Sequence, residues 1–110
     1  MSKDVFPENK RYHLRYLPLF EEDLQQIVDY ISVQLENPDA AENLLQAVED
    51  AIYQRTTCAE AFEPFPSNRN RQQLYYRIYV QNYIVFYVVI DDVMEIRRIL
   101  YARRDMPALI

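Results

Sequence analysis

Arginine and tyrosine side chains that could bind an anion are concentrated in the last part of this sequence. Residues 68–110 contain seven arginines, no lysine and four acidic residues, although the whole chain carries a net charge of −5. Four of the arginines stand in two adjacent pairs within residues 95–105, EIRRILYARRD. A guanidinium binds a carboxylate or a phosphate as a planar fork. The pattern predicts an anionic partner, or internal pairing with residues 18–67, where eleven acids accompany one arginine.

The composition also excludes several classes of function. Glycine is absent, so Gly-rich phosphate loops of the P-loop or Rossmann kind cannot form. Cys58 is the only cysteine and His13 the only histidine; no internal disulfide can form, and we expect no cofactor and no metal site. No apolar run approaches the roughly 20 residues that span a membrane, and the first residues lack the apolar core of a signal peptide. These features predict a cytoplasmic protein with no membrane contact.

Hydrophobic periodicity predicts the elements that position the arginines. Residues 11–17 alternate as a short strand, and residues 18–57 show two stretches of helical spacing, broken at Asn37-Pro38. Residues 58–70 read as a loop. Strands follow at 73–80, 83–90 and 93–102, joined by two-residue turns in which Asn and Asp replace the missing glycine. The fold class is therefore α+β, with the order β-α-α-β-β-β and a helical hairpin packed on an antiparallel sheet. We expect one domain over residues 1–110, with a flexible extension at 1–10 and a tail at 106–110.

Two-residue turns would sort the strand residues onto two faces. One face is apolar and should pack on the helices, except for Arg98, which we expect to pair there with a carboxylate. The other face would interleave aromatic residues with arginines, and such a face binds bases and phosphates, or an acidic peptide, or is simply partly solvated. A β-bulge would exchange the assignments beyond it. The predicted apolar face includes Leu100, and the predicted mixed face includes Tyr75, Arg77, Tyr79, Ile84, Phe86, Val88, Glu95, Arg97, Ile99, Tyr101 and Arg103.

Several segments, taken in order, resemble the RelE/ParE toxin superfamily of bacterial type II toxin–antitoxin systems, which includes plasmid stabilisation proteins. They are the helix opening EEDLQQIVDYI, the hinge NPDAAENL, the strands in YRIYVQNYIVFYVV, and the strand end ILYARRD. The resemblance covers most of the chain, and the fold it implies agrees with the periodicity.

The resemblance implies one of two activities. Some members are metal-independent, ribosome-dependent mRNA endonucleases, and others poison DNA gyrase without cutting RNA. In the nuclease branch, Arg77, Tyr79 and Arg104 stand at the catalytic positions. Ile84 occupies the place of a second-strand arginine, and no His or Tyr follows Arg104. The incomplete set favours the ParE-like branch, in which the chain binds a target such as gyrase. A degenerate, non-toxic interaction module is the third alternative.

The resemblance also implies a protein partner, a cognate antitoxin that is often acidic. Tyr75, Arg97, Tyr101 and Arg103 are the candidate contacts, and the grooves of the helical hairpin are a second candidate surface. A homodimer is a further possibility. In the nuclease alternative, the partners would be the ribosome and its mRNA.

Overall fold

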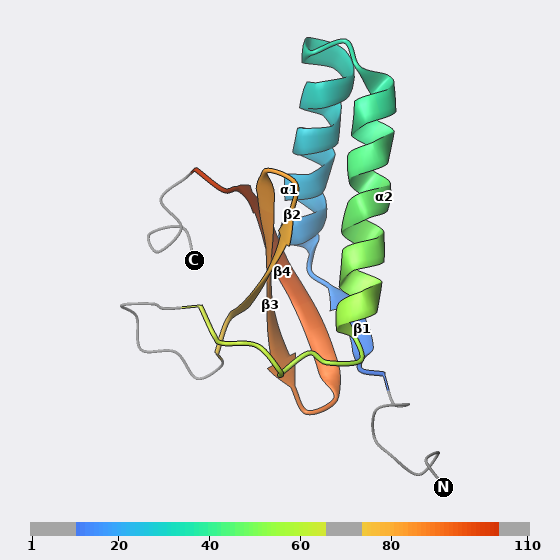
Figure 1. Ribbon diagram of the computed structural model, residues 1–110. Helices are drawn as coiled ribbons and strands as arrows, with labels where there is room; N and C mark the ends of the chain where they lie inside the picture. The colour runs from blue at the N-terminus through green and yellow to red at the C-terminus, as the bar shows by residue number, and fades with distance from the viewer. Residues whose placement is uncertain (1–10, 66–73, 104–110) are drawn as a thin grey trace, which may run out of the picture.

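The computed structural model describes residues 11–65 and 74–103 of the chain (Figure 1). The predicted extension at 1–10 and tail at 106–110 lie outside these ranges. The elements follow the predicted order closely. They are β1 (His13–Tyr16), α1 (Pro18–Asp29), the π-helical turn η3 (Tyr30–Gln34), α2 (Pro38–Arg55), β2 (Tyr76–Val80), β3 (Tyr83–Ile90) and β4 (Val93–Tyr101).

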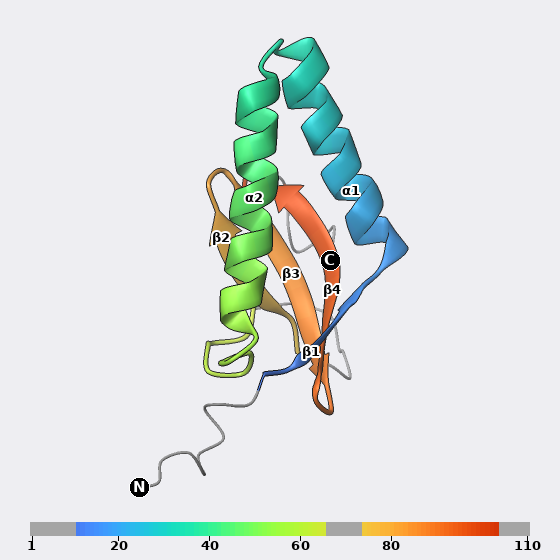
Figure 2. The ribbon, with the colours of Figure 1, turned by 90° about the vertical axis from the view of Figure 1, so that its right-hand side faces the viewer.

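The strands form one sheet in the order β1-β4-β3-β2. The three C-terminal strands are an antiparallel meander, as predicted. β1 pairs with β4 in parallel, so the sheet is mixed rather than purely antiparallel. A parallel neighbour requires a crossover connection, and the helical hairpin provides part of it. The hairpin covers one face of the sheet, with α1 and α2 side by side (Figures 1 and 2). The predicted α+β architecture is confirmed.

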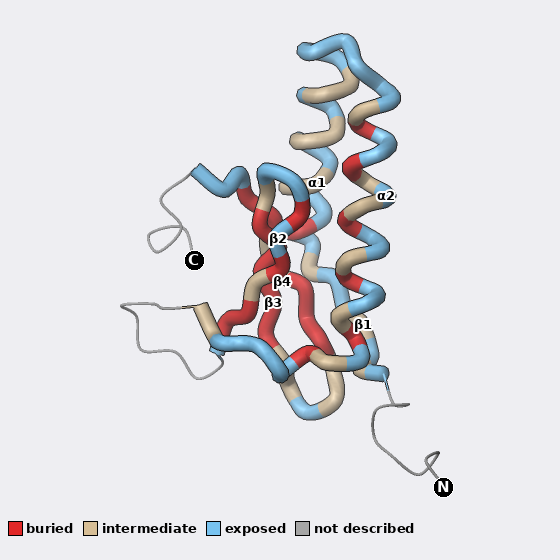
Figure 3. Tube along the Cα trace, viewed as in Figure 1, coloured by how far each residue is buried: buried red, intermediate tan, exposed pale blue. Residues whose placement is uncertain are grey.

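The second helix begins where the sequence places its start signals. The Asn37 side chain accepts a hydrogen bond of 3.1 Å from the Ala40 backbone N–H, and Pro38 occupies the first helical turn. From this start, α2 directs Leu44, Val48 and Ile52 toward the sheet, and all three are buried. Figure 3 shows this buried stripe on α2, while the tip of the hairpin stays exposed.

Three tight turns use residues other than glycine at positive φ. Glu36 in the helical hairpin has φ 51°, and Gln81 and Asp91, the first residues of the two β-turns, have φ 53° and 56°. The left-handed region costs a residue with a Cβ about 1–2 kcal/mol. The two-residue turns were predicted, but Gln81, not Asn82, takes the positive φ of the first.

This strain gives a stability prediction. Glu36→Gly should raise the free energy of unfolding by roughly 0.5–1 kcal/mol, because glycine adopts positive φ without a steric cost. Urea unfolding followed by circular dichroism measures the change. The control is Gln34→Gly, two residues earlier in the helical segment, which should lower stability by about 1 kcal/mol. Equal losses in both variants would contradict the assignment of strain to Glu36.

A β-bulge in β4 changes which residues share a face. Phe86 pairs with Arg98 and Tyr87 pairs with Ile96, so Arg97 is inserted between them. Beyond this point the predicted faces are exchanged. Ile99 is buried among the residues that contact the helices, and Leu100 is buried on the opposite face. The prediction that both strands keep an unbroken alternation was therefore wrong after Arg97, because one extra residue reverses the pleat.

Both faces of the sheet carry buried apolar side chains. The larger cluster joins the helices to the sheet through residues such as Phe20, Leu44, Val85 and Tyr87. The smaller cluster lies on the face away from the helices and consists of Tyr75, Ile84, Phe86, Val88 and Leu100, with Phe65 and Ile90 packed against it. The face predicted as a mixture of aromatics and arginines is thus largely a second core.

Within the part of the chain that the structure describes, no helix combines the length and the apolar character that crossing a membrane requires.

Candidate functional site

Three of the four arginines of residues 95–105 lie within the described residues, their surroundings differ, and Arg98 is structural. Its guanidinium donates two hydrogen bonds to Asp23 of α1, with Nε to Oδ2 at 2.8 Å and Nη2 to Oδ1 at 3.0 Å. The predicted pairing of Arg98 with a carboxylate of the helices is confirmed, although the bulge sets Arg98 opposite Phe86 in the strand register. Asp23 Oδ2 also accepts the Ile99 backbone N–H at 3.1 Å. Asp23 therefore binds the edge of β4 beyond Ile96, where β1 ends.

Arg97 belongs to a second cluster, on the face away from the helices. Glu95 is buried there, and its Oε1 accepts from Arg15 Nη2 at 2.8 Å and Nε at 3.2 Å. The other oxygen, Oε2, accepts from Arg97 Nε at 3.1 Å. Arg97 Nη1 donates to the Tyr75 hydroxyl at 3.1 Å. One carboxylate thus holds two guanidinium groups, and the cluster carries a surplus positive charge.

The electrostatics of Glu95 follow from these contacts. Burial raises the pKa of a carboxyl group, but the hydrogen bond from Arg15 and the charge of Arg97 outweigh burial and hold the pKa of Glu95 below its usual value. Glu95 is therefore ionised at neutral pH and keeps both arginines in place.

Arg77 and Tyr79 lie together on β2, in contact with the loop that follows α2. The Arg77 guanidinium carbon lies 5.2 Å from the centre of the Phe65 ring and 5.8 Å from that of Tyr79. The Tyr79 side chain is largely exposed. Such cation–π contacts fix a guanidinium without consuming its charge.

The third predicted catalytic residue, Arg104, lies outside the described residues. Ile84, at the position of the expected second-strand arginine, is buried between Tyr79 and Leu100 in the strand register. The structure thus brings together two members of the predicted nuclease set, Arg77 and Tyr79, and places an apolar side chain beside them.

The predicted partner-binding residues separate into two regions. Tyr75 and Arg97 touch each other in the Glu95 cluster. Tyr101 does not lie with them; it packs edge-on against Tyr83, with ring centres 5.7 Å apart, on the side of the helices. The predicted placement of Tyr101 on the mixed face is therefore corrected, and the cause is again the bulge at Arg97. Arg103 follows β4 and is exposed.

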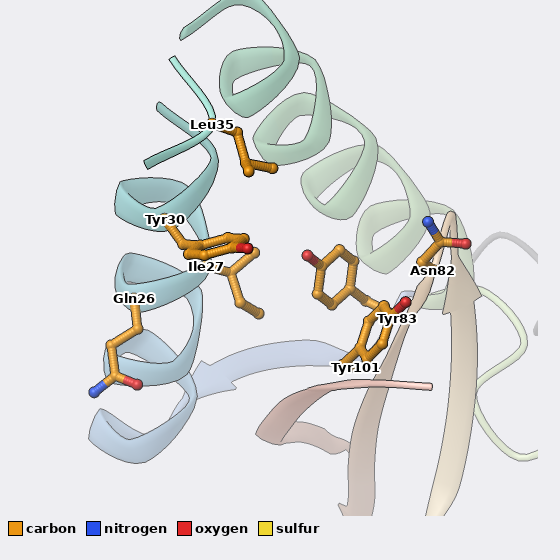
Figure 4. A pocket seen from close by; sticks show the side chains of 7 residues that line it. All are labelled: Gln26, Ile27, Tyr30, Leu35, Asn82, Tyr83 and Tyr101. Atoms are coloured by element: carbon orange, nitrogen blue, oxygen red, sulfur yellow. The ribbon is translucent and has the colours of Figure 1, made fainter. Parts of the chain in front are cut away.

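Tyr101 and Tyr83 form one wall of an open pocket of about 540 Å³ between the end of the sheet and the helical hairpin. Figure 4 shows the opposite wall, where Ile27 projects from α1 and Tyr30 from η3, with Leu35 above them. The lining is apolar and aromatic, apart from the side chains of Gln26 and Asn82. Burial, with smaller contributions from Tyr101 and Tyr30, raises the pKa of Tyr83, so the phenol is neutral at physiological pH.

Sequence reasoning missed Arg15, Tyr30 and Tyr83 as site residues. Arg15 reaches Glu95 because β1 is parallel to β4 and sets Arg15 opposite Glu95; the sequence offers alternation in residues 11–17 but nothing that specifies this register. Tyr30 faces the pocket from the π-helical turn, and wider turns of this type often occur at functional sites. Among the described residues, no group of three His, Cys, Asp or Glu side chains could hold a metal ion.

The fold is shared with two solved toxin–antitoxin structures. A chain of the chromosomal ParDE TA system from P. aeruginosa superposes with a TM-score of 0.70 at 18% identity, covering 84% of this chain and 98% of that one. A chain of the archaeal RelE–RelB complex from Pyrococcus horikoshii superposes with a TM-score of 0.51 at 19% identity, covering 86% and 98%. At these identities the likeness establishes the fold alone. No curated protein sequence matches the chain.

The family itself is established by the sequence. The family model described as the ParE toxin of the type II toxin–antitoxin system parDE matches residues 14–106. This range includes every described strand and helix apart from the first residue of β1. The chain therefore belongs to the ParE toxin family, which places it in the superfamily that its sequence resembles.

Proposed function

We propose that this chain is a ParE-like toxin that inhibits a cellular target by binding it, with DNA gyrase as the target, and that a cognate antitoxin neutralises it in the cytoplasm. Membership of the ParE family supports this branch over the nuclease branch. Both similar structures are, by their printed names, parts of toxin–antitoxin assemblies, which supports a protein partner.

The observation that carries the proposal is the environment of Ile84. A nuclease of this superfamily would place an arginine there, to stabilise the charge that develops on a phosphate. Ile84 is only 5% exposed and packs in the cluster of Tyr75, Phe86, Val88 and Leu100. Arg77 is also a poor general base, because a guanidinium does not lose its proton in proteins. RNA cleavage would therefore lack both a stabiliser and a base at these positions.

Two surfaces are proposed as contacts for the antitoxin. The first is the Glu95 cluster with Tyr75 and Arg97, where charge favours an acidic segment. The second is the aromatic pocket of Tyr30, Tyr83 and Tyr101, which suits apolar side chains of an amphipathic helix. Tyr101, the last residue of β4, lines this pocket, and Arg103 follows it two residues later in the chain.

Controlled expression in bacteria tests the proposal. We expect growth arrest when the chain is expressed alone, and recovery when the neighbouring reading frame is expressed with it. Primer extension across abundant mRNAs should show no new cleavage at the ribosomal A site. Cleavage that disappears in Arg104→Ala would establish the nuclease alternative instead. Normal growth at a verified protein level would indicate a non-toxic interaction module.

A further inference from the structure

The Glu95 cluster contains more hydrogen-bond donors than its own carboxylate uses. A guanidinium has five N–H donors. Arg15 uses Nε and Nη2, and Arg97 uses Nε and Nη1. Within the described residues, Arg15 Nη1 and Arg97 Nη2 have no hydrogen-bond acceptor in the protein. Each arginine thus retains one NH₂ group that could bind a further acceptor.

The exposed fractions of the Glu95, Arg15 and Arg97 side chains favour the binding of an anion. The Glu95 side chain is 8% exposed, whereas those of Arg15 and Arg97 are 50% and 28% exposed. The negative charge is enclosed and the two positive charges face solvent. Because both arginines are held by Glu95, an incoming anion meets donors that are already oriented, which lowers the entropic cost of binding.

Within residues 11–65 and 74–103, Glu95 is the only carboxylate that forms an ion pair with Arg15 or Arg97. Asp23 of α1 is already bonded to Arg98 and to the Ile99 amide, and the hairpin that carries the other acidic residues of α1 and α2 covers the opposite face of the sheet (Figure 1). The near face consists of the apolar cluster of Phe86, Val88 and Leu100. An apolar surface beside two guanidinium groups lowers the local dielectric constant and strengthens their attraction for an anion.

We infer that Arg15 and Arg97, held by Glu95 beside Tyr75, form a binding site for a carboxylate side chain from an acidic segment of a protein partner. A nucleic acid fits less well, because its affinity depends on neutralising several phosphates, and this cluster offers one surplus charge in a chain of net charge −5. The identity of that partner as the antitoxin rests on the proposed function; the site itself does not.

Fluorescence anisotropy with the purified full chain tests this inference. The probe is a fluorescein-labelled polyglutamate peptide at low ionic strength, and a labelled oligouridylate RNA serves as the competing class of ligand. We expect the chain to bind the peptide more tightly than the RNA. Arg15→Gln and Arg97→Gln should each weaken peptide binding about fivefold, the upper range for a partly exposed ion pair.

Two further variants make the result specific. Arg11→Gln removes the same charge from a position before β1 whose contacts are with Tyr53 and Thr56, and its affinity should match that of the wild type. Arg15→Lys keeps a charge beside Glu95, so the fold is retained, but it loses the forked donors; its affinity should lie between those of the wild type and Arg15→Gln. Thermal unfolding verifies that each variant is folded.

Three results would overturn the inference. They are tighter binding of the RNA than of the peptide, a loss of peptide affinity in Arg11→Gln equal to that in Arg15→Gln, or wild-type peptide affinity in both Arg15→Lys and Arg97→Gln. The proposed function is tested separately. A chain that arrests growth but binds no acidic peptide would remove only the carboxylate site, and one that binds the peptide without arresting growth would remove only the toxin assignment.

Discussion

Asp23→Ala should lower the free energy of unfolding by about 3 kcal/mol, because it leaves the Arg98 guanidinium and the Ile99 amide without their acceptor. The Asp23 and Arg98 side chains are only 11% and 23% exposed, so water replaces the lost carboxylate poorly. Asp23 also closes the edge of β4 where β1 stops. The loss should therefore exceed that of an ordinary surface ion pair, which is worth about 1 kcal/mol or less.

Urea unfolding of Asp23→Ala measures this effect, and Asp29→Ala provides the matched control on the same helix. Asp29 is exposed and bonds only the Gln25 side chain among the described residues, so its loss should cost less than about 0.5 kcal/mol. In the double variant Asp23→Ala/Arg98→Met, part of the stability should return, because the unpaired charge is also removed. A loss in Asp23→Ala no larger than that in Asp29→Ala would contradict the structural role assigned to Arg98.

Glu95→Gln should lower the free energy of unfolding by about 2 kcal/mol at neutral pH, since both Arg15 and Arg97 lose a charged acceptor. The same interaction makes wild-type stability depend on pH. The pKa of Glu95 is lower in the folded chain than in the unfolded chain. Its contribution is therefore fully present above the unfolded-state pKa and is lost as the pH falls through the folded-state pKa.

Urea unfolding across the acidic range separates Glu95 from other carboxyl groups. The difference in stability between the wild type and Glu95→Gln should shrink as the pH falls below about 4.3, the usual value for a glutamic acid. Glu63→Gln removes the same charge from an exposed loop. Its free energy of unfolding should equal that of the wild type at every pH. A difference that stays constant on acidification would exclude the charged state of Glu95 as its source.

Much of the fold follows from local sequence signals. Asn37-Pro38 specifies the start of α2 through its cap, and the predicted strand boundaries fall within about three residues of β2, β3 and β4. The two-residue turns at Gln81 and Asp91 fix the meander, because they set which residues pair. These features depend on neighbours in the sequence, so a single chain reveals them.

The faces of β4 could not be predicted, because they depend on contacts that are distant in the sequence. The bulge at Arg97 coincides with the bonds from Arg98 and Ile99 to Asp23, some 75 residues earlier. Alternation alone places Leu100 on the helix side and Tyr101 on the other, and the structure reverses both. The two arginines of the carboxylate site come from β1 and β4, and only the parallel register joins them.

The candidate site was accordingly predicted in part. Tyr75 and Arg97 were expected on one face and do contact each other. Arg15 was not expected, because a lone arginine in a short alternating strand has no distinguishing pattern. The aromatic pocket requires the π-helical turn that brings Tyr30 opposite Tyr83 (Figure 4), and such a turn has no dependable sequence signature.

A DNA supercoiling assay with purified gyrase and the purified chain tests the central claim most directly, that the chain inhibits a target by binding and does not cut RNA. The account predicts that relaxed plasmid remains relaxed when the chain is present in excess over gyrase, and that mRNA on translating ribosomes stays intact at the same concentration. Unimpaired supercoiling together with A-site cleavage of the mRNA would contradict it.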